Sequence, residues 1–315
     1  MGGIVCVLLA RGVLRWIVIG VGAPLRSVHR RVWACRADWA GGLRTLTAYS
    51  GSRFRLGAAE STAVVAALCA IDGGALESAT SFELAYVMAG EDEIRVGLAD
   101  AWAVRLESAA PVRRFASYRG QRHLSGSWWS ATDGRHVGFE SWVERDHVMA
   151  LDFDPRVVAI ASQPFWLFWP SDGGGRGFRS HAPDFFARGA DGTGIVVDCR
   201  PENRRKPRDL AVFEMTRQAC ELVGWEYRLL GVPDPVVTAN LRWMAGYRHP
   251  RYFRDDVAER LQAAFAEPVG LMDGAEVVGD PIAVLPVLFH LIWCHRLAAD
   301  LSRPLRAVTP VRASC

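Results

Sequence analysis

Apolar and polar residues alternate along the chain from Phe82, and this pattern predicts β-structure. Phe82–Val87 and Ile94–Leu98 each follow the two-residue period of a strand, and a polar turn that begins at Gly90 separates them. We therefore expect a hairpin. Further short strands are expected at residues 101–104 and 111–118, and 128–137 is expected to contain a strand, an Asp-Gly turn and the entry to the helix.

A period of three to four residues marks the expected helices. The run after Glu140 is apolar at Trp142, Val143, Val148, Met149 and Leu151, which predicts a helix of about three turns. Lys206–Val223 is a second helix that Gly224 ends, and Asp234-Pro235 begins a third that is expected to reach Tyr247. Strands are expected twice within 153–169, at Asp184, at 194–198 and at 225–232.

The last part of the chain has a mainly helical pattern. Arg254–Phe265 is an expected helix, and Asp280–Cys294 is a strongly apolar one that we expect Pro286 to interrupt. Another helix is expected to begin at Leu297, and Arg303–Arg312 suits a small hairpin or wing. A winged-helix module is one arrangement that accommodates these elements.

Length and composition allow two or three domains, because half of the 315 residues are hydrophobic. Residues 1–79 are an N-terminal extension of uncertain structure, with one helix-like run at Ala58–Ile71. We expect residues 80–251 to form an α/β domain, a mixed central sheet flanked by helices. Residues 252–315 then form the small helical domain.

Charge, cysteines and the first residues narrow the class of protein. The net charge of +3 is small, so nucleic-acid binding would rest on local basic patches. The seven cysteines contain no Cys-x-x-Cys pair, which argues against zinc and for reduced thiols in a cytoplasmic protein. Arg11 and Arg15 break the apolar start, so neither a membrane span nor a signal peptide is expected.

Four ionisable residues lie in a suggestive order between Glu140 and Arg200. Glu144 is on the predicted helix, Asp184 lies in a Pro-Asp-Phe context, and Asp198 and Arg200 share one face of a β-branched strand. If hairpin pairing brings Asp184 alongside, these groups converge on one pocket. Carboxylates that hold a divalent metal, with a cation beside them, suit phosphodiester hydrolysis.

The residues around these positions carry a family resemblance. Glu144-x-x-x-x-Met-x-Leu-x-Phe-Asp-Pro-x-Val, then Gln163-Pro, Ala-Pro-Asp184-Phe and Val-Val-Asp198-Cys-Arg200-Pro, resembles the TnsA-like endonuclease subunit of heteromeric transposases. This family is a branch of the restriction-endonuclease-like PD-(D/E)xK nucleases. The resemblance covers about Phe82 to Arg251 and is strongest from Glu140 to Arg200.

The resemblance implies a fold, a cofactor and partners. It implies a restriction-endonuclease-like core and Mg²⁺ or Mn²⁺ as cofactor. The subunit would cut one strand of double-stranded DNA at each transposon end, while a TnsB-like partner transposase cuts and joins the other. Glu144, Asp184 and Asp198 would be metal ligands, with the Cys199 backbone carbonyl as a further one, and Arg200 would occupy the position of a catalytic lysine.

Two departures from the family pattern, at Asp198 and Arg200, leave alternatives open. The family usually has Glu or Gln at the first position and Lys at the second, and Arg cannot transfer a proton. Lys206 is an alternative cation, Glu140 is an alternative inward acid, and a structural ion pair is an alternative role for Asp198 and Arg200. An inactive DNA-binding or partner-docking subunit and a stand-alone restriction or repair nuclease are the alternative functions.

Basic residues with interleaved aromatics suggest where DNA would lie. The candidate DNA contacts are Arg113, Arg114, Arg119, Arg122, Arg204 and Arg205. A solvated face over core tryptophans is the alternative for the first four. We expect His147 and His181 to be structural, since no metal-ligand spacing supports them.

Overall fold

The computed structural model divides the chain into two compact units, Met1–Leu76 and Glu77–Cys315. It describes residues 81–101, 104–115, 125–171 and 177–314, together with the backbone of five strands before them. In the first unit β1 (Gly3–Leu9) pairs with β2 (Val13–Ile19), and β3 (Cys35–Ala37), β4 (Leu46–Ala48) and β5 (Arg53–Phe54) form a second sheet. The helix-like run at 58–71 lies outside the described residues.

One sheet of the second unit contains the expected first hairpin. Its strand order is β13 (Phe178–His181), β12 (Trp166–Pro170), β6 (Glu83–Met88) and β7 (Glu93–Gly97), with β8 (Ala109–Ala110) also paired to β6. The predicted hairpin is confirmed as β6 and β7, which are antiparallel. Short helical turns follow in α3 (Leu98–Ala101) and η1 (Leu106–Ser108).

The strands expected at 101–104 and 111–118 do not form in those of their residues that the structure describes. Ala101 ends α3 instead of beginning a strand, while residues 102 and 103 lie outside the described part. Residues 111–115 form no strand, and 116–118 are again outside. The strand expected before the Asp-Gly turn is β9 (Gly126–Trp129), and the turn joins it to a second strand, β10 (His136–Phe139), where the entry to the helix was expected.

The second sheet is mixed. β11 (Val157–Ser162), β14 (Phe185–Gly189) and β15 (Gly194–Cys199) are antiparallel neighbours. β16 (Glu226–Leu230) joins β15 in parallel after a crossover through α5 (Pro207–Val223), which is preceded by η2 (Glu202–Arg204). A parallel pair needs such a crossover, and Gly224 ends the helix in the left-handed conformation, with φ of 72°.

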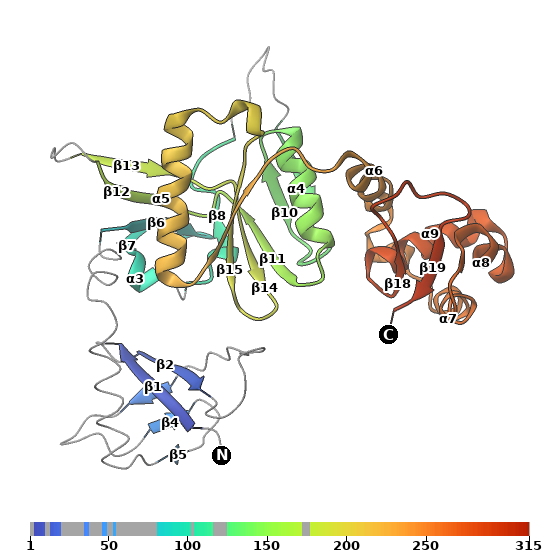
Figure 1. Ribbon diagram of the computed structural model, residues 1–315, viewed down its shortest axis with the longest axis horizontal. Helices are drawn as coiled ribbons and strands as arrows, with labels where there is room; N and C mark the ends of the chain where they lie inside the picture. The colour runs from blue at the N-terminus through green and yellow to red at the C-terminus, as the bar shows by residue number, and fades with distance from the viewer. Residues whose placement is uncertain are drawn as a thin grey trace. The chain divides into compact units, whose positions relative to one another are not determined.

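Side-chain alternation places this sheet between two helices. Phe185 and Val197 pack in one hydrophobic cluster with Met149 of α4 (Trp142–Phe153). Phe186 and Val196 point to the opposite face and pack with Cys220 and other residues of α5. Figure 1 shows α4 and α5 with β14 and β15 between them. The second unit is therefore a mixed α/β structure.

Asp152, near the end of α4, fixes that helix to the β9–β10 hairpin. Its buried carboxylate accepts hydrogen bonds from Trp128 Nε1 at 2.9 Å, Ser130 Oγ at 2.8 Å and Ala131 N at 3.1 Å. Thr132 donates to it from both its main-chain N, at 2.9 Å, and its hydroxyl, at 2.8 Å. The helix that carries Glu144 is thus held at its far end.

The C-terminal part combines short helices with a small sheet. Its elements are α6 (Pro235–Met244), η3 (Ala245–Tyr247), η4 (Pro250–Tyr252), α7 (Asp255–Ala264), β17 (Val269–Gly270), α8 (Leu271–Val278), α9 (Pro281–Trp293), β18 (Leu297–Ala299) and β19 (Pro310–Ala313). The predicted start of α6 is confirmed, because Asp234 Oδ1 accepts from the main-chain N of Val236 and Val237. The sheet has the order β17-β19-β18 and is antiparallel.

Two predictions for this part were wrong. α9 continues through Pro286, because buried residues on both sides of it, Val284 and Leu288, pack both turns into the core. The segment from Leu297 is a strand, since pairing with β19 decides its conformation. In the described part of the chain, no helix combines the length and the apolar character that a membrane crossing needs.

Candidate functional site

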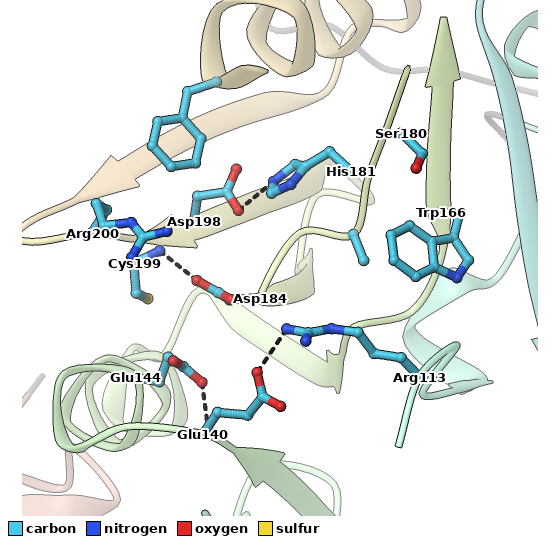
Figure 2. Close-up of a pocket in the computed structure, with 12 residues that line it drawn as sticks. Arg113, Glu140, Glu144, Trp166, Ser180, His181, Asp184, Asp198, Cys199 and Arg200 are labelled. Atoms are coloured by element: carbon cyan, nitrogen blue, oxygen red, sulfur yellow. Dashed lines mark hydrogen bonds and ion pairs between the residues drawn. The ribbon is translucent and has the colours of Figure 1, made fainter. Parts of the chain in front are cut away.

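One pocket of about 340 Å³ contains all five of the residues predicted to form the metal site. It is lined by Arg113, Glu140, Glu144, Trp166, Ser180, His181, Ala182, Asp184, Asp198, Cys199, Arg200 and Phe213. These side chains come from α4, α5, the ends of β14 and β15, and the neighbouring sheet. Figure 2 shows the Asp184 carboxyl between those of Asp198 and Glu144.

Strand register explains how Asp184 reaches the end of β15. Phe185 pairs with Val197 in the antiparallel β14–β15 ladder, so the residue before Phe185 lies beside the residues after Val197. The main-chain N of Cys199 donates a hydrogen bond of 2.7 Å to Asp184 Oδ2. Side chains far apart in the sequence therefore meet where the two strands meet.

Asp184 is buried next to two other carboxylates, and this environment makes its ionised form unfavourable. Burial raises the pKa of Asp184 well above its ordinary value, and the negative charges of Asp198 and Glu144 raise it further. Burial and the same three carboxylates also raise the pKa of the Cys199 thiol. A proton or a bound cation would relieve this repulsion.

Glu140 and Glu144 both face the pocket, so the two candidate acids are not exclusive. Glu144 Oε2 accepts from Glu140 N at 2.6 Å, and Glu144 Oε1 accepts from the Ser141 hydroxyl at 2.8 Å. Burial raises the pKa of Glu144, although these hydrogen bonds oppose the rise. Glu140 instead forms an ion pair with Arg113 Nη2 at 2.7 Å. Arg113, a candidate DNA contact, is thus held at the pocket.

Asp198 is deeply buried and both of its oxygens already have partners. It is 1% exposed, its Oδ1 lies 2.8 Å from His181 Nε2, and its Oδ2 accepts from Tyr227 Oη at 2.8 Å. Which of the two groups donates in the His181–Asp198 hydrogen bond follows from the tautomer of the ring. Burial and then the charge of Asp198 raise the pKa of Tyr227, which remains a neutral donor.

Sequence reasoning missed the contributions of His181 and Tyr227. His181 was expected to be structural, yet its ring lines the pocket and contacts the predicted ligand Asp198. Tyr227 lies on β16, and only the parallel pairing of β15 with β16 brings it to Asp198. His147 does fit a structural role, since its Nε2 lies 2.7 Å from the Gly231 carbonyl oxygen.

Arg200 lines the pocket, while the other predicted cations have different positions. In the described structure Arg200 makes no ion pair with Asp198, and its main-chain N donates to Leu230 O at 2.8 Å. Arg205 Nε donates to Arg200 O at 3.0 Å, and the side chain of Lys206, the N-cap residue of α5, is exposed and does not line the pocket. Arg114 and Arg204 are exposed, and Arg119 and Arg122 lie outside the described residues.

Gln163 joins two sides of the pocket through its backbone. Gln163 N donates to Asp184 O at 3.0 Å, and Gln163 O accepts from Val112 N at 2.9 Å, next to Arg113. Its φ of 45° is unfavourable for a residue with a side chain. Its buried amide finds no hydrogen-bond partner among the described residues. The local backbone is strained where it positions Asp184.

The donor chemistry of the pocket fits a hard divalent cation held by few protein ligands. Within the described residues, no three His, Cys, Asp or Glu side chains are arranged as a formed metal centre. Magnesium usually keeps several waters and binds one or two carboxylates together with substrate phosphates. Asp184 and Glu144 provide such carboxylates, whereas Asp198 is committed to His181 and Tyr227.

Comparison with known proteins adds no assignment. No protein-family model and no curated protein sequence matches the chain. Function is therefore inferred from the residues and geometry of the pocket.

Proposed function

We propose that this chain is a metal-dependent DNA endonuclease subunit of a heteromeric transposase, of the TnsA-like class. One observation carries the proposal: Asp184 lies beside Glu144 and Asp198 in one pocket, and burial together with their charges raises its pKa. Because these carboxylates repel one another when ionised, a bound cation would stabilise their ionised forms. Arg200 lines the same pocket and supplies the positive charge that a phosphate requires.

Each pocket residue has a proposed role. Asp184 and Glu144 would hold Mg²⁺ or Mn²⁺, and the Cys199 backbone carbonyl is a further proposed ligand. When bound, the metal polarises the phosphate and activates water. Arg200 orients and stabilises the phosphoryl oxygens without transferring a proton. Asp198, predicted as a ligand, orients His181 in the described geometry.

The arrangement of elements supports the finer fold assignments. An acid on α4 beside an antiparallel β14–β15 pair, with parallel β16 after α5, supports a restriction-endonuclease-like core. The order α7, β17, α8, α9, β18, β19, with the sheet order β17-β19-β18, supports a winged-helix arrangement at the C-terminus. Double-stranded DNA at transposon ends and a TnsB-like transposase are the proposed partners.

Cleavage of transposon-end DNA with the partner transposase present tests this function. With Mg²⁺ we expect nicking by the wild type and at least a hundredfold loss in Asp184→Asn. Asp256→Asn is a matched control, since this carboxylate is 63% exposed and far from the pocket in sequence. Cleavage by Asp184→Asn at the wild-type rate would remove the proposed site. Activity without the partner would favour a stand-alone nuclease.

The arginine at position 200 supports a second candidate, an inactive DNA-binding or partner-docking subunit. The family to which the sequence is similar usually has a lysine there, and the exposed Lys206 does not line the pocket. Under this alternative the wild type does not cleave, and Arg200→Lys gains cleavage from zero. Cleavage by the wild type decides against it.

A further inference from the structure

Two exposed tryptophans lie on α4 and α6, together with two arginines whose side chains are 21% and 50% exposed. Trp142 is 51% exposed and Trp243 is 60% exposed. The Arg145 guanidinium lies over the Trp142 ring, 4.2 Å from its centroid, and Arg242 is the neighbour of Trp243. We call these four residues the α4–α6 strip.

Asp146 organises the two arginines of the strip. Its buried carboxylate accepts from Arg145 Nη2 at 2.7 Å and from Arg242 Nη2 at 2.6 Å, and Nε of each arginine also donates to it. Although burial opposes it, these bonds hold the pKa of Asp146 below its ordinary value. Two guanidinium groups against one carboxylate leave the strip positively charged. Nη1 of each has no partner in the described structure.

The chemistry of the strip fits DNA. Fixed guanidinium groups bind phosphates, and exposed indole rings stack on unpaired bases regardless of their sequence. The α8–α9 pair, which would face DNA in a winged-helix protein, has the opposite character. Residues 271–293 contain Asp273, Glu276 and Asp280 but no Arg or Lys. Phosphates would be repelled there.

The strip also begins at the pocket. Trp142 lies in the first turn of α4, between Glu140 and Glu144, which both line the pocket. DNA with a phosphate in the pocket would lie close to this turn. We propose that the α4–α6 strip binds the DNA strand flanking the cut, with Trp142 and Trp243 stacking on unpaired bases and Arg145 and Arg242 contacting phosphates. Cutting of this strand rests on the proposed function, whereas DNA binding by the strip does not.

DNA binding in EDTA tests the strip without cleavage. The probes are a fluorescein-labelled duplex with a single-stranded extension and the same duplex with blunt ends, read by fluorescence anisotropy. We expect Trp142→Ala and Trp243→Ala each to weaken binding to the extended duplex at least fivefold, and to affect the blunt duplex less. Phe at either position restores part of the affinity, because the ring is retained. Arg242→Gln lowers the slope of log affinity against log salt by about 0.7–0.9.

Matched controls separate the strip from general surface effects. Ile282→Ala removes an apolar side chain that is 84% exposed on α9, and Arg303→Gln removes an arginine whose side chain is 86% exposed. Both are expected to bind the extended duplex within twofold of wild type. Thermal unfolding of every variant shows whether it is folded.

The outcomes also distinguish this inference from the proposed function. Unchanged binding in both tryptophan variants overturns the strip, even if Asp184→Asn abolishes cleavage. Loss of binding to the partner transposase with DNA affinity unchanged also overturns it, in favour of a protein-docking surface. Weakened DNA binding in the strip variants upholds it, even if the wild type never cleaves.

Discussion

Replacing Asp152 with asparagine tests how α4 is held in place. The carboxylate receives five donors, three on Oδ1 and two on Oδ2. An amide retains only one acceptor oxygen. If its NH₂ takes the Oδ2 position, Trp128 Nε1 and Ala131 N each face another donor. If it takes the Oδ1 position, Thr132 N faces a donor, while the two hydroxyl groups can rotate to accept.

The number of donors that lose their acceptor sets the expected loss of stability. At least one buried N–H loses its partner in either orientation, and each such loss costs about 1–3 kcal/mol. The remaining hydrogen bonds also lose the assistance of the negative charge, which makes them about half as strong. We therefore expect Asp152→Asn to lower the free energy of unfolding by about 2–4 kcal/mol. That is a large part of a typical stability of about 5–15 kcal/mol.

Urea unfolding, followed by far-UV circular dichroism and tryptophan fluorescence, measures this loss. Asp256→Asn is the control, because its carboxylate is 63% exposed and its ion pairs are expected to contribute under about 1 kcal/mol. A loss under about 0.5 kcal/mol in Asp152→Asn would refute the reasoning. Partial unfolding would also displace Glu144, so cleavage is compared only where the variant is folded.

Two further predictions concern the carboxylates of the pocket. The folded protein binds the Asp184 proton more tightly than the unfolded chain, so wild-type stability falls as pH rises from about 4 through the raised pKa. Asp184→Asn lacks this loss: in EDTA its Tm exceeds that of the wild type at about pH 8 more than at about pH 5, and Mg²⁺ raises only the wild-type Tm. Parallel pH profiles would contradict this. Tyr227→Phe leaves Asp198 Oδ2 without its donor and should lower the free energy of unfolding by about 1–3 kcal/mol, measured by urea unfolding; a loss under about 0.5 kcal/mol would show that solvent replaces the bond.

Elements that begin or end at a turn or a capping residue could be predicted from the sequence. The β6–β7 hairpin follows from alternation around a polar turn, and α6 begins at Asp234 because its carboxylate caps the helix. α8 was missed because Gly274, in its middle, weakens the helical pattern. That glycine is required by packing, since an added Cβ would lie 2.3 Å from the Phe265 ring.

In the candidate site, too, some residues could be predicted from local sequence and others could not. Glu144, Asp184 and Arg200 were each predicted from residues next to them in sequence. The β14–β15 register brings Asp184 to the end of β15, and α4 carries Glu144 to the same pocket. The hydrogen-bond partners of Asp198 could not be predicted from neighbouring residues. Tyr227 is brought close by the parallel pairing of β15 with β16, and His181 lies on β13, a strand of the other sheet. Local patterns therefore identified the acids but not the hydrogen bonds that already occupy one of them.

Lys206 allows the protein to be labelled at a single side chain. It is the single lysine among 37 lysine and arginine residues, and it is exposed at the N-cap of α5. Apart from the α-amino group, an amine-reactive dye can therefore attach at one position. That position follows Arg205, whose side chain holds the backbone of Arg200. A fluorophore there would test whether metal or DNA binding changes the environment of the segment that follows Arg200, without a cysteine being introduced or removed.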